Sequence, residues 1–267
     1  MAGPRDLRQL AFASTTDAIR DMARRAPGGV VHDEGGLVLV AGPHWLPVLV
    51  NTVTRLDPSV AADDVIARAN DFFFPRGRGY SVQALDGRDD DLITAADQAG
   101  FASQGDAGAT PLMVLEAPPA SVDVPDGGRV ERATTAAHVD DIVALCADAY
   151  AVYGMPADVV PASLLPPSIV LAAHLVAYVA YDDVGPVATA QALATHGCAY
   201  VQWVATAQRA FKRGFGGAIT QATTIGGFEL GASMATLIAS PMGAPLYRKL
   251  GWTDVGTISS RFTLPPR

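Results

Sequence analysis

Cysteine, charged residues and long apolar runs are all scarce in this chain of 267 residues. The two cysteines are too few for a disulfide framework and lack the spacing of a zinc site, so we expect small buried apolar residues. The most apolar run, residues 169–181, is interrupted by His174 and is shorter than the ~20 residues that a bilayer requires. No charged-then-apolar leader opens the sequence. We therefore expect a cytoplasmic protein without a membrane span.

Basic residues are outnumbered by acidic ones, and the formal net charge is −8. Affinity for a phosphate backbone depends on stripes of Lys and Arg, which this sequence lacks, so nucleic acid is not an expected partner. His32, His44 and His138 show no metal-ligand spacing with each other or with a cysteine, and we expect no metal. With 49% hydrophobic residues, the chain can bury one large core or two domain-sized ones.

One segment, residues 200–219, carries more functional information than the rest of the chain. It reads as an alternating strand, a basic turn, a glycine turn and a helix. Glycines without a Cβ let a ligand approach backbone amides, and at a helix start these amides lack helical partners. The helix dipole favours an anion there by ~0.3–1 kcal/mol, and two cations precede the glycines. The residues of this expected phosphate site are Lys212, Arg213, Gly214, Phe215, Gly216 and Gly217.

Other glycine-rich nucleotide sites fit this segment poorly. A dinucleotide fingerprint needs its first glycine directly after the strand, and a Walker loop ends in Gly-Lys-Ser or Gly-Lys-Thr. The segment instead resembles the pyrophosphate motif of the GNAT acyltransferase superfamily, which reads Val-Ala-Thr, a spacer, basic residues and Gly-aromatic-Gly. The resemblance implies acetyl-CoA as co-substrate, with backbone donors for its pantetheine arm at Val204, Ala205 and Thr206. Phe211 departs from the family pattern, which has Arg or Gln there, and could reduce affinity for coenzyme A.

The resemblance continues downstream and covers the chain from Glu131 to its end. Residues 235–240 are similar to the family's next strand, and residues 245–252 to its closing helix, whose tyrosine often protonates the departing thiolate. This implies that Tyr247 is the catalytic acid, although helix-face packing is the alternative. The segment that bends over the acceptor in the family corresponds here to Tyr150, Tyr153 and Met155, for which simple packing is equally open.

The general base is harder to identify. Family members often use a carboxylate on the fourth strand or a water chain, but Gln202 and Trp203 occupy the corresponding positions and neither takes a proton readily. His196 and Asp148 are possible substitutes, with a surface or core role as the alternative for each.

The first half looks like a weak copy of the second. Residues 79–115 repeat the layout of residues 235–264, but residues 57–64 have three carboxylates and no glycine where the second half has its phosphate turn. We therefore expect an α/β (α+β) protein of two GNAT-like halves, each a mixed, mostly antiparallel twisted sheet flanked by helices. The predicted domains are 1–120, degenerate, and 129–267, which binds acetyl-CoA; the turn-rich segment 121–128 links them. Asp89, Asp90 and Asp91 are expected to cap and solvate a helix start.

Two functions are open at this point. The first is an N-acetyltransferase that transfers an acetyl group from acetyl-CoA to a primary amine of a small molecule, with Tyr247 as general acid. The second is a non-catalytic acyl-CoA-binding sensor or interaction module, suggested by Phe211 and the missing carboxylate. Because tandem halves can cover each other's sheet edges, a monomer is as acceptable as a homodimer.

Overall fold

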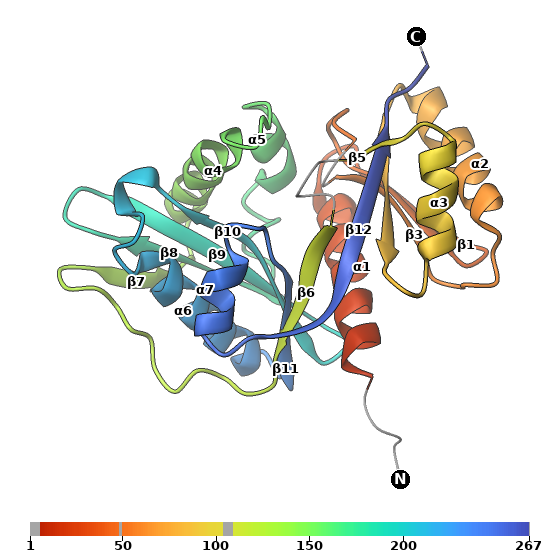
Figure 1. The fold of residues 1–267 in the computed structure, drawn as a ribbon. Helices are drawn as coiled ribbons and strands as arrows, with labels where there is room; N and C mark the ends of the chain where they lie inside the picture. Colours follow the sequence, from red (N-terminus) through yellow and green to blue (C-terminus); the bar gives the residue numbers. More distant parts are fainter. Residues whose placement is uncertain (1–5, 48–49, 104–108, 267) are drawn as a thin grey trace.

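The computed structural model describes residues 6–47, 50–103 and 109–266. Within them, one twisted sheet of twelve strands extends through the molecule (Figure 1). The strands are β1 (Val30–Glu34), β2 (Leu37–Ala41), β3 (Asn51–Arg55), β4 (Tyr80–Leu85), β5 (Ala102–Ser103), β6 (Ala109–Leu115), β7 (Arg129–Arg132), β8 (Leu175–Tyr181), β9 (Pro186–Thr195), β10 (Cys198–Thr206), β11 (Met234–Ile238) and β12 (Thr253–Thr263). Their order is β1-β2-β3-β4-β12-β6-β11-β10-β9-β8-β7, and β5 pairs with β12.

Most neighbouring strands in this sheet are antiparallel. Among the described strands, β3 pairs with β4 and β10 with β11 in the parallel sense, one such pair in each half of the chain. The expected fold class, with mixed and mostly antiparallel strands flanked by helices, is confirmed. Each parallel pair is joined through a helix, as a parallel connection requires. The repeat inferred from the sequence is therefore a repeat of strand, helix and strand.

The two halves exchange their last strands. Strand β6 belongs to the first half in sequence but pairs with β11 of the second, in the register Leu115 opposite Ala235. Strand β12 closes the chain but pairs with β4 of the first half, in the register Leu85 opposite Ile258. The exchanged strands also pair with each other. Each half of the sheet is thus completed by the other, while the division into domains at residues 121–128 stays a prediction.

Helices cover both faces of the sheet. They are α1 (Leu7–Arg25), α2 (Ala62–Phe73), α3 (Asp90–Gln98), α4 (Ala136–Ala151), α5 (Val159–Leu164), α6 (Phe215–Glu229) and α7 (Ala244–Lys249), with short 3-10 turns η1 (Phe74–Arg76) and η3 (Gln208–Ala210). Buried side chains of α2 and α3 pack on the strands of the first half. Helices α6 and α7 pack on those of the second. Helices α1, α4 and α5 lie on the opposite face.

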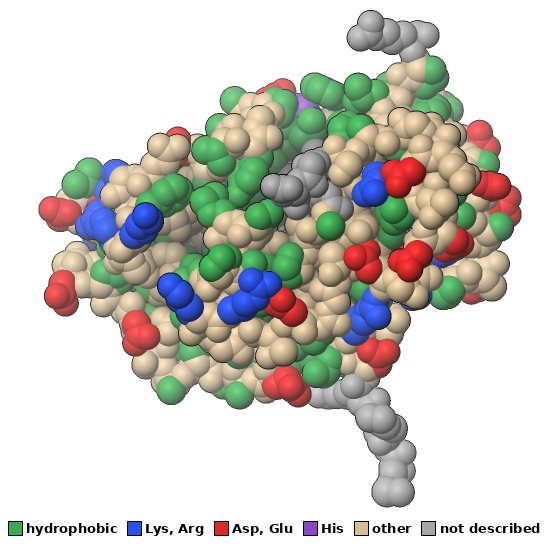
Figure 2. All heavy atoms as spheres, viewed as in Figure 1, with side chains coloured by type: hydrophobic (Ala, Val, Ile, Leu, Met, Phe, Trp, Pro, Cys, Tyr) green, Lys and Arg blue, Asp and Glu red, His purple; other side chains and the backbone are tan. Residues whose placement is uncertain are grey.

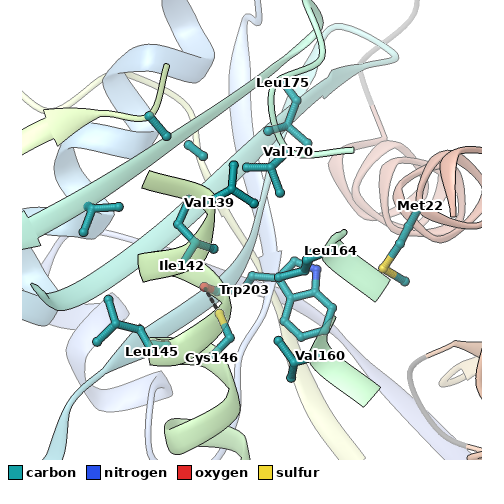
Figure 3. Close-up of a cluster of buried hydrophobic side chains, with 14 of the residues drawn as sticks. Met22, Val139, Ile142, Leu145, Cys146, Val160, Leu164, Val170, Leu175 and Trp203 are labelled. Atoms are coloured by element: carbon teal, nitrogen blue, oxygen red, sulfur yellow. Dashed lines mark hydrogen bonds between the residues drawn. The ribbon is translucent and has the colours of Figure 1, made fainter. Parts of the chain in front are cut away.

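Helix α1 joins the two halves and was not expected from the sequence. Its buried face includes Phe12 and Met22 but also hydroxyl residues, so the apolar pattern is weak. Thr15 and Thr16 hydrogen-bond to carbonyls one turn earlier, and the Ser14 hydroxyl lies 2.8 Å from that of Thr236 on β11. Local bonding of this kind lets hydroxyl side chains be buried in a helix. Met22 reaches from α1 toward the core under α4 and α5 (Figure 3).

Helix α4 begins at a capping threonine. Thr135 is its N-cap and accepts a hydrogen bond from the amide of His138. Its buried residues Ile142, Leu145 and Cys146 face the sheet, and both Cys146 and Cys198 are buried, as expected. None of the helices in the described ranges combines the length and apolarity needed to span a bilayer.

Candidate functional site

The feature that shapes the site is a split between two parallel strands. Strand β10 pairs with β11 only from Cys198 to Tyr200, although β10 continues to Thr206. On its other edge, β11 pairs with β6. Beyond Tyr200 the edge of β10 that faces β11 is therefore free of its neighbour. A strand edge of this kind presents backbone groups that an extended ligand can bind. Val204, Ala205 and Thr206, assigned to the pantetheine arm, lie in this part of β10.

A bulge in β10 accompanies the split. Gln202 is opposite Gln191 of β9 and Ala205 is opposite Thr189, so Trp203 and Val204 together face one residue. Trp203 has a φ of 51°, which is rare and costly for a bulky residue. Its carbonyl accepts a hydrogen bond from the Cys146 thiol of α4 at 3.7 Å (Figure 3). Since the C=O and N–H of a trans peptide point in opposite directions, the next amide is directed away from α4.

The bulge is held by the surrounding core. Trp203 is 8% exposed, and in Figure 3 its ring lies among Val160, Leu164 and Cys146. This packing stabilises a conformation that the backbone alone disfavours. Strain of this kind persists only where the surroundings fix it, and it is often found at ligand sites.

The glycine turn lies directly beyond this strand. Helix α6 begins at Phe215, and Gly214 is its N-cap with a φ of 93°. The amides of Gly217 and Ala218 donate to the Gly214 carbonyl. Among the described residues, the amides of Gly214, Phe215 and Gly216 donate no backbone hydrogen bond. Three adjacent N–H groups at a helix start are thus available to an anion.

Contacts around the turn explain two of its glycines. A Cβ on Gly214 would lie 3.2 Å from Cγ of Pro125, in a backbone conformation that side chains rarely adopt. A Cβ on Gly216 would lie 3.2 Å from the Thr206 hydroxyl, between α6 and the end of β10. Gly217 is different, because its Cβ would make only ordinary contacts at 3.9 Å with Leu246 and Leu250. An added Cβ would therefore be crowded at Gly214 and Gly216 but not at Gly217.

The turn-rich segment between the halves braces this turn. The amide of Asp123 donates to the Gln221 side chain at 3.0 Å, and the Gln221 amide group returns a bond to the Asp123 carboxylate at 2.9 Å. Pro125 contacts the position of Gly214, and a Cβ on Gly128 would meet the ring of Phe215 at 2.8 Å. The segment is therefore packed against the first two turns of α6, a role that its composition did not indicate.

The cations of the turn are not equivalent. Arg213 donates to Asp182 at 2.9 Å, and Arg209 donates to both oxygens of the same carboxylate at 2.7 and 2.8 Å. Lys212 is exposed, has a φ of 62° and pairs with no carboxylate in the described ranges. Lys212 is thus the fully available charge, while Arg213 keeps its unused N–H donors for a phosphate. Figure 2 shows Lys and Arg side chains over the end of the molecule that contains β8, α6 and α7.

Asp182 binds both arginines, a contact that was not predicted from the sequence. It lies in the turn after β8, is 5% exposed and accepts hydrogen bonds from the Val184 and Gly185 amides. The hydrogen bond from Arg209, supported by those from the Val184 amide and Arg213, holds the pKa of Asp182 well below its usual 3.8. No pattern in the sequence places this aspartate beside the glycine turn, because the two segments meet only in the folded sheet.

The two aromatic residues of the turn lie in opposite environments. The Phe215 side chain is fully buried between β8, β9 and α6, so only its backbone can contact a ligand. Phe211, at the position where the family has Arg or Gln, is 46% exposed. Its backbone N–H is bonded to the Gln208 carbonyl. The groups that this turn offers to an anion are therefore Lys212, Arg213 and the free amides, without a side-chain donor at Phe211.

Tyr247 lies on α7 beside the split. Its side chain is 7% exposed and contacts Trp252 with ring centroids 6.1 Å apart. Its hydroxyl makes no hydrogen bond to another described residue. Burial, followed by the nearby Tyr153 and Tyr200, raises the pKa of the Tyr247 phenol well above 10. The phenol is consequently protonated throughout the neutral range, as a general acid must be before it acts.

The structure brings four tyrosines together, here called the tyrosine cluster: Tyr150, Tyr153, Tyr200 and Tyr247. They come from α4, the turn after α4, β10 and α7. Tyr150 contacts Tyr153 with ring centroids 6.3 Å apart. It also contacts Trp203 edge to face at 5.4 Å. The hydroxyl groups are close enough to act on one another electrostatically, and burial raises the pKa of Tyr200 to about 12. Tyr150 and Tyr153, expected at the acceptor, are thus grouped with Tyr247, and Met155 packs against the same core.

Neither candidate for the general base joins this cluster. His196 lies in the turn before β10, where it pairs with Asp17 of α1 at 2.8 Å. The strand from Cys198 to Trp203 adds about 16 Å between that turn and the bulge. Asp148 is exposed on α4. Gln202 is partly buried on β10, but an amide does not accept a proton at neutral pH.

The corresponding place in the first half is closed. Strands β3 and β4 stay paired from Thr52 to Thr54, almost to the end of β3. There Arg55, 1% exposed, donates to Asp89 at 3.0 Å and to Asp91 at 2.6 Å, which ties β3 to the start of α3. The expectation that these aspartates solvate a helix start is wrong for Asp89, which is fully buried and makes no side-chain cap. Buried carboxylates need such partners.

Metal binding depends on how the histidine and acidic groups of the described residues are placed. No group of three or more His, Cys, Asp or Glu side chains within the described ranges could hold a metal ion. His174 is 38% exposed and pairs with Asp21 of α1 at 3.0 Å, at the edge where α1 meets β8.

Comparison with solved structures identifies the fold. The chain is similar to a GCN5-related N-acetyltransferase from Kribbella flavida, with a TM-score of 0.69, 19% identity and 96% of each chain covered. It is also similar to a GCN5-related N-acetyltransferase from Sphaerobacter thermophilus, with a TM-score of 0.63, 15% identity and coverage of 98% of this chain and 95% of that one. A tandem GNAT protein from the clavulanic acid biosynthesis pathway matches over 96% of each chain, with a TM-score of 0.58 and 12% identity. No protein-family model and no curated protein sequence matches. The chain therefore has the fold of GNAT acetyltransferases along almost its full length.

Proposed function

We propose that this protein transfers an acetyl group from acetyl-CoA to a primary amine of a small molecule. The observation that carries the proposal is the split between β10 and β11, which has the free amides of the α6 start beyond β10 and Tyr247 on α7, the helix that follows β11. A diphosphate at the glycine turn, an extended arm in the split and a thioester beside the phenol fit this order of features. Similarity to solved acetyltransferases supports the fold on which the proposal rests.

The chemistry follows from what each group can do. The diphosphate would be held by the amides of Gly214, Phe215 and Gly216 together with Lys212 and the free donors of Arg213. Backbone N–H groups of the bulged strand would polarise the thioester carbonyl. One well-aimed donor of this kind contributes about 2.7–4 kcal/mol when it meets the developing oxyanion.

Tyr247 would supply the proton for the leaving thiolate. The amine nitrogen attacks the carbonyl carbon, the C–S bond breaks, and the sulfur takes the phenolic proton. Burial raises the pKa of this phenol, but a thiolate formed in the same low-dielectric surroundings is destabilised as well. The thiolate therefore still gains by accepting the proton. The nitrogen gives its excess proton to water, and water returns a proton to the tyrosine.

The test is release of free thiol from acetyl-CoA with a panel of amines, alongside calorimetric titration of acetyl-CoA. Tyr247→Phe is expected to lower turnover by roughly one to three orders of magnitude while the dissociation constant for acetyl-CoA stays nearly unchanged. Tyr200→Phe is the matched control, since it removes a partly buried phenol from the same cluster without removing the proposed acid. An unchanged rate in Tyr247→Phe would end its assignment as the acid.

A binding module without catalysis is the second candidate. The specific observation in its favour is the absence of a carboxylate or histidine beside Tyr247: within the described residues, the groups that act on its pKa are tyrosines. Tight acetyl-CoA binding with no thiol release for any amine would support this candidate. A cytoplasmic location and a monomeric or dimeric state stay predictions under either function.

A further inference from the structure

The tyrosine cluster has a chemical character that bears on the acceptor. It combines the phenols of Tyr150, Tyr153, Tyr200 and Tyr247 with the indole of Trp203. Tyr247 and Trp203 are 7% and 8% exposed, whereas Tyr153 is 51% exposed and marks the end that is open to solvent. Figure 2 shows hydrophobic side chains gathered around a hollow on the face of the molecule between α4, α5 and β6. The surroundings of the proposed acid are thus aromatic and apolar.

The acidic and histidine side chains of α4, α5 and the turn before β10 are exposed or already paired. Asp148 is exposed on α4, His196 is bound to Asp17 at the far end of β10, and Asp158 at the start of α5 is paired with His44 at 3.2 Å. The Nδ1 of His44 already accepts the Leu46 amide, so both ring nitrogens of this histidine are occupied. None of these groups is placed to take a proton from an amine beside Tyr247.

This setting disfavours an ordinary alkylamine. An alkylammonium with a pKa near that of lysine, about 10.4, is neutral in only about one molecule in 2,500 at pH 7. A site with a carboxylate can bind the ammonium and remove its proton. An apolar site with phenols must instead capture the rare neutral form, because burying an unpaired ammonium is costly.

We infer that the preferred acceptor is an amine that is already uncharged at neutral pH and is attached to an aromatic ring, an arylamine. The inference rests on the proposed function and specifies the substrate class of the same site. The ring can pack edge to face against Tyr150 and Trp203, as these two already do with each other. The nitrogen lone pair forms the C–N bond, the C–S bond breaks, the sulfur takes the Tyr247 proton, and the nitrogen loses its proton to water.

Gln202 is the position at which this preference can be reversed. It is partly buried on β10, on the same strand as Tyr200, and lies opposite Gln191 in the sheet register. The Gln191 side chain is 1% exposed, and its amide nitrogen has no hydrogen-bond partner among the described residues. Directly opposed side chains lie within contact distance, so a carboxylate at 202 can accept a bond from this amide. Gln202→Glu therefore adds a base with almost no change in volume.

The experiment compares aniline with benzylamine in the thiol-release assay at pH 7. Both carry the same ring, but aniline is uncharged and benzylamine is a cation. The wild type is expected to have a kcat/KM for aniline at least tenfold higher than for benzylamine, when the comparison allows for the weaker nucleophilicity of the aniline nitrogen. In Gln202→Glu the ratio is expected to fall at least tenfold, through faster turnover of benzylamine. Thermal unfolding of both proteins checks that the variant is folded.

The outcomes separate the inference from the function beneath it. Turnover of benzylamine in preference to aniline by the wild type overturns the inference and leaves the acetyltransferase intact. That result would mean that the aromatic rings hold an ammonium by cation–π contacts until water removes its proton. An unchanged ratio in a folded Gln202→Glu variant also overturns it. If the protein binds acetyl-CoA but releases no thiol from it with aniline, benzylamine or other alkylamines, both the proposed function and the inference are refuted.

Discussion

Replacing Gly214 by alanine tests the phosphate turn most directly. Gly214 has a φ of 93°, where a residue with a Cβ costs about 1–2 kcal/mol. The added methyl would also lie 3.2 Å from Cγ of Pro125, closer than most such contacts. This cost must lower either the free energy of unfolding or the free energy of acetyl-CoA binding. If the turn keeps its conformation, the free energy of unfolding falls; if the turn relaxes, the amides leave their positions and acetyl-CoA binding weakens instead.

The assay measures both quantities on the same variant. The loss in unfolding free energy from urea titration and the loss in binding free energy from calorimetry should together reach about 1–2 kcal/mol, equivalent to a 5–30-fold change if all of it falls on binding. Gly217→Ala is the matched control, because its Cβ meets only ordinary contacts at 3.9 Å inside α6. That variant should gain roughly 0.5–1 kcal/mol of stability with unchanged affinity. Wild-type stability and affinity in Gly214→Ala would refute the argument.

Two further predictions concern buried ion pairs. Asp89→Asn should lower the free energy of unfolding by about 3 kcal/mol in urea titration, because Arg55 and Arg88 lose a fully buried carboxylate; a loss below about 1 kcal/mol would show that the network is not needed. The pKa of Asp182 is depressed chiefly by the hydrogen bond from Arg209, so its stabilising contribution is present above the unfolded value of 3.8 and is lost as the pH falls through the lower folded value. The stability difference between wild type and Asp182→Asn should therefore shrink between about pH 5 and about pH 2; a constant difference would contradict this.

Much of the fold can be predicted from local patterns. The alternation in residues 200–204, the glycine turn and the apolar face after it predict the unit β10, turn and α6, which the structure contains. The internal repeat is confirmed as a repeat of strand, helix and strand. These features depend on short-range geometry and on a period of side-chain burial, both of which a sequence displays. The roles of the site residues stay predictions.

Features that depend on distant contacts could not be predicted. Helix α1 buries serine and threonine against the centre of the sheet, so its pattern of apolar residues is faint. Asp182 reaches the arginines of the glycine turn only because β8 and the start of α6 meet in the folded sheet. The exchange of β6 and β12 leaves no local mark, since either strand would satisfy the same hydrogen bonds and the same period in its own half.

The exchange of strands also explains why a half without a phosphate turn matters to the site in the other. Strand β6 pairs with β11 along Ala235–Ile238, on the edge opposite to the split, and so fixes one wall of the opening between β10 and β11. Met22 of α1 packs into the core that holds Trp203 and the bulge. In the first half, Arg55 and Asp89 close the equivalent opening. The first half is therefore closed by an ion pair where the second is open, and its strand β6 and helix α1 support the strained backbone beside the proposed thioester position.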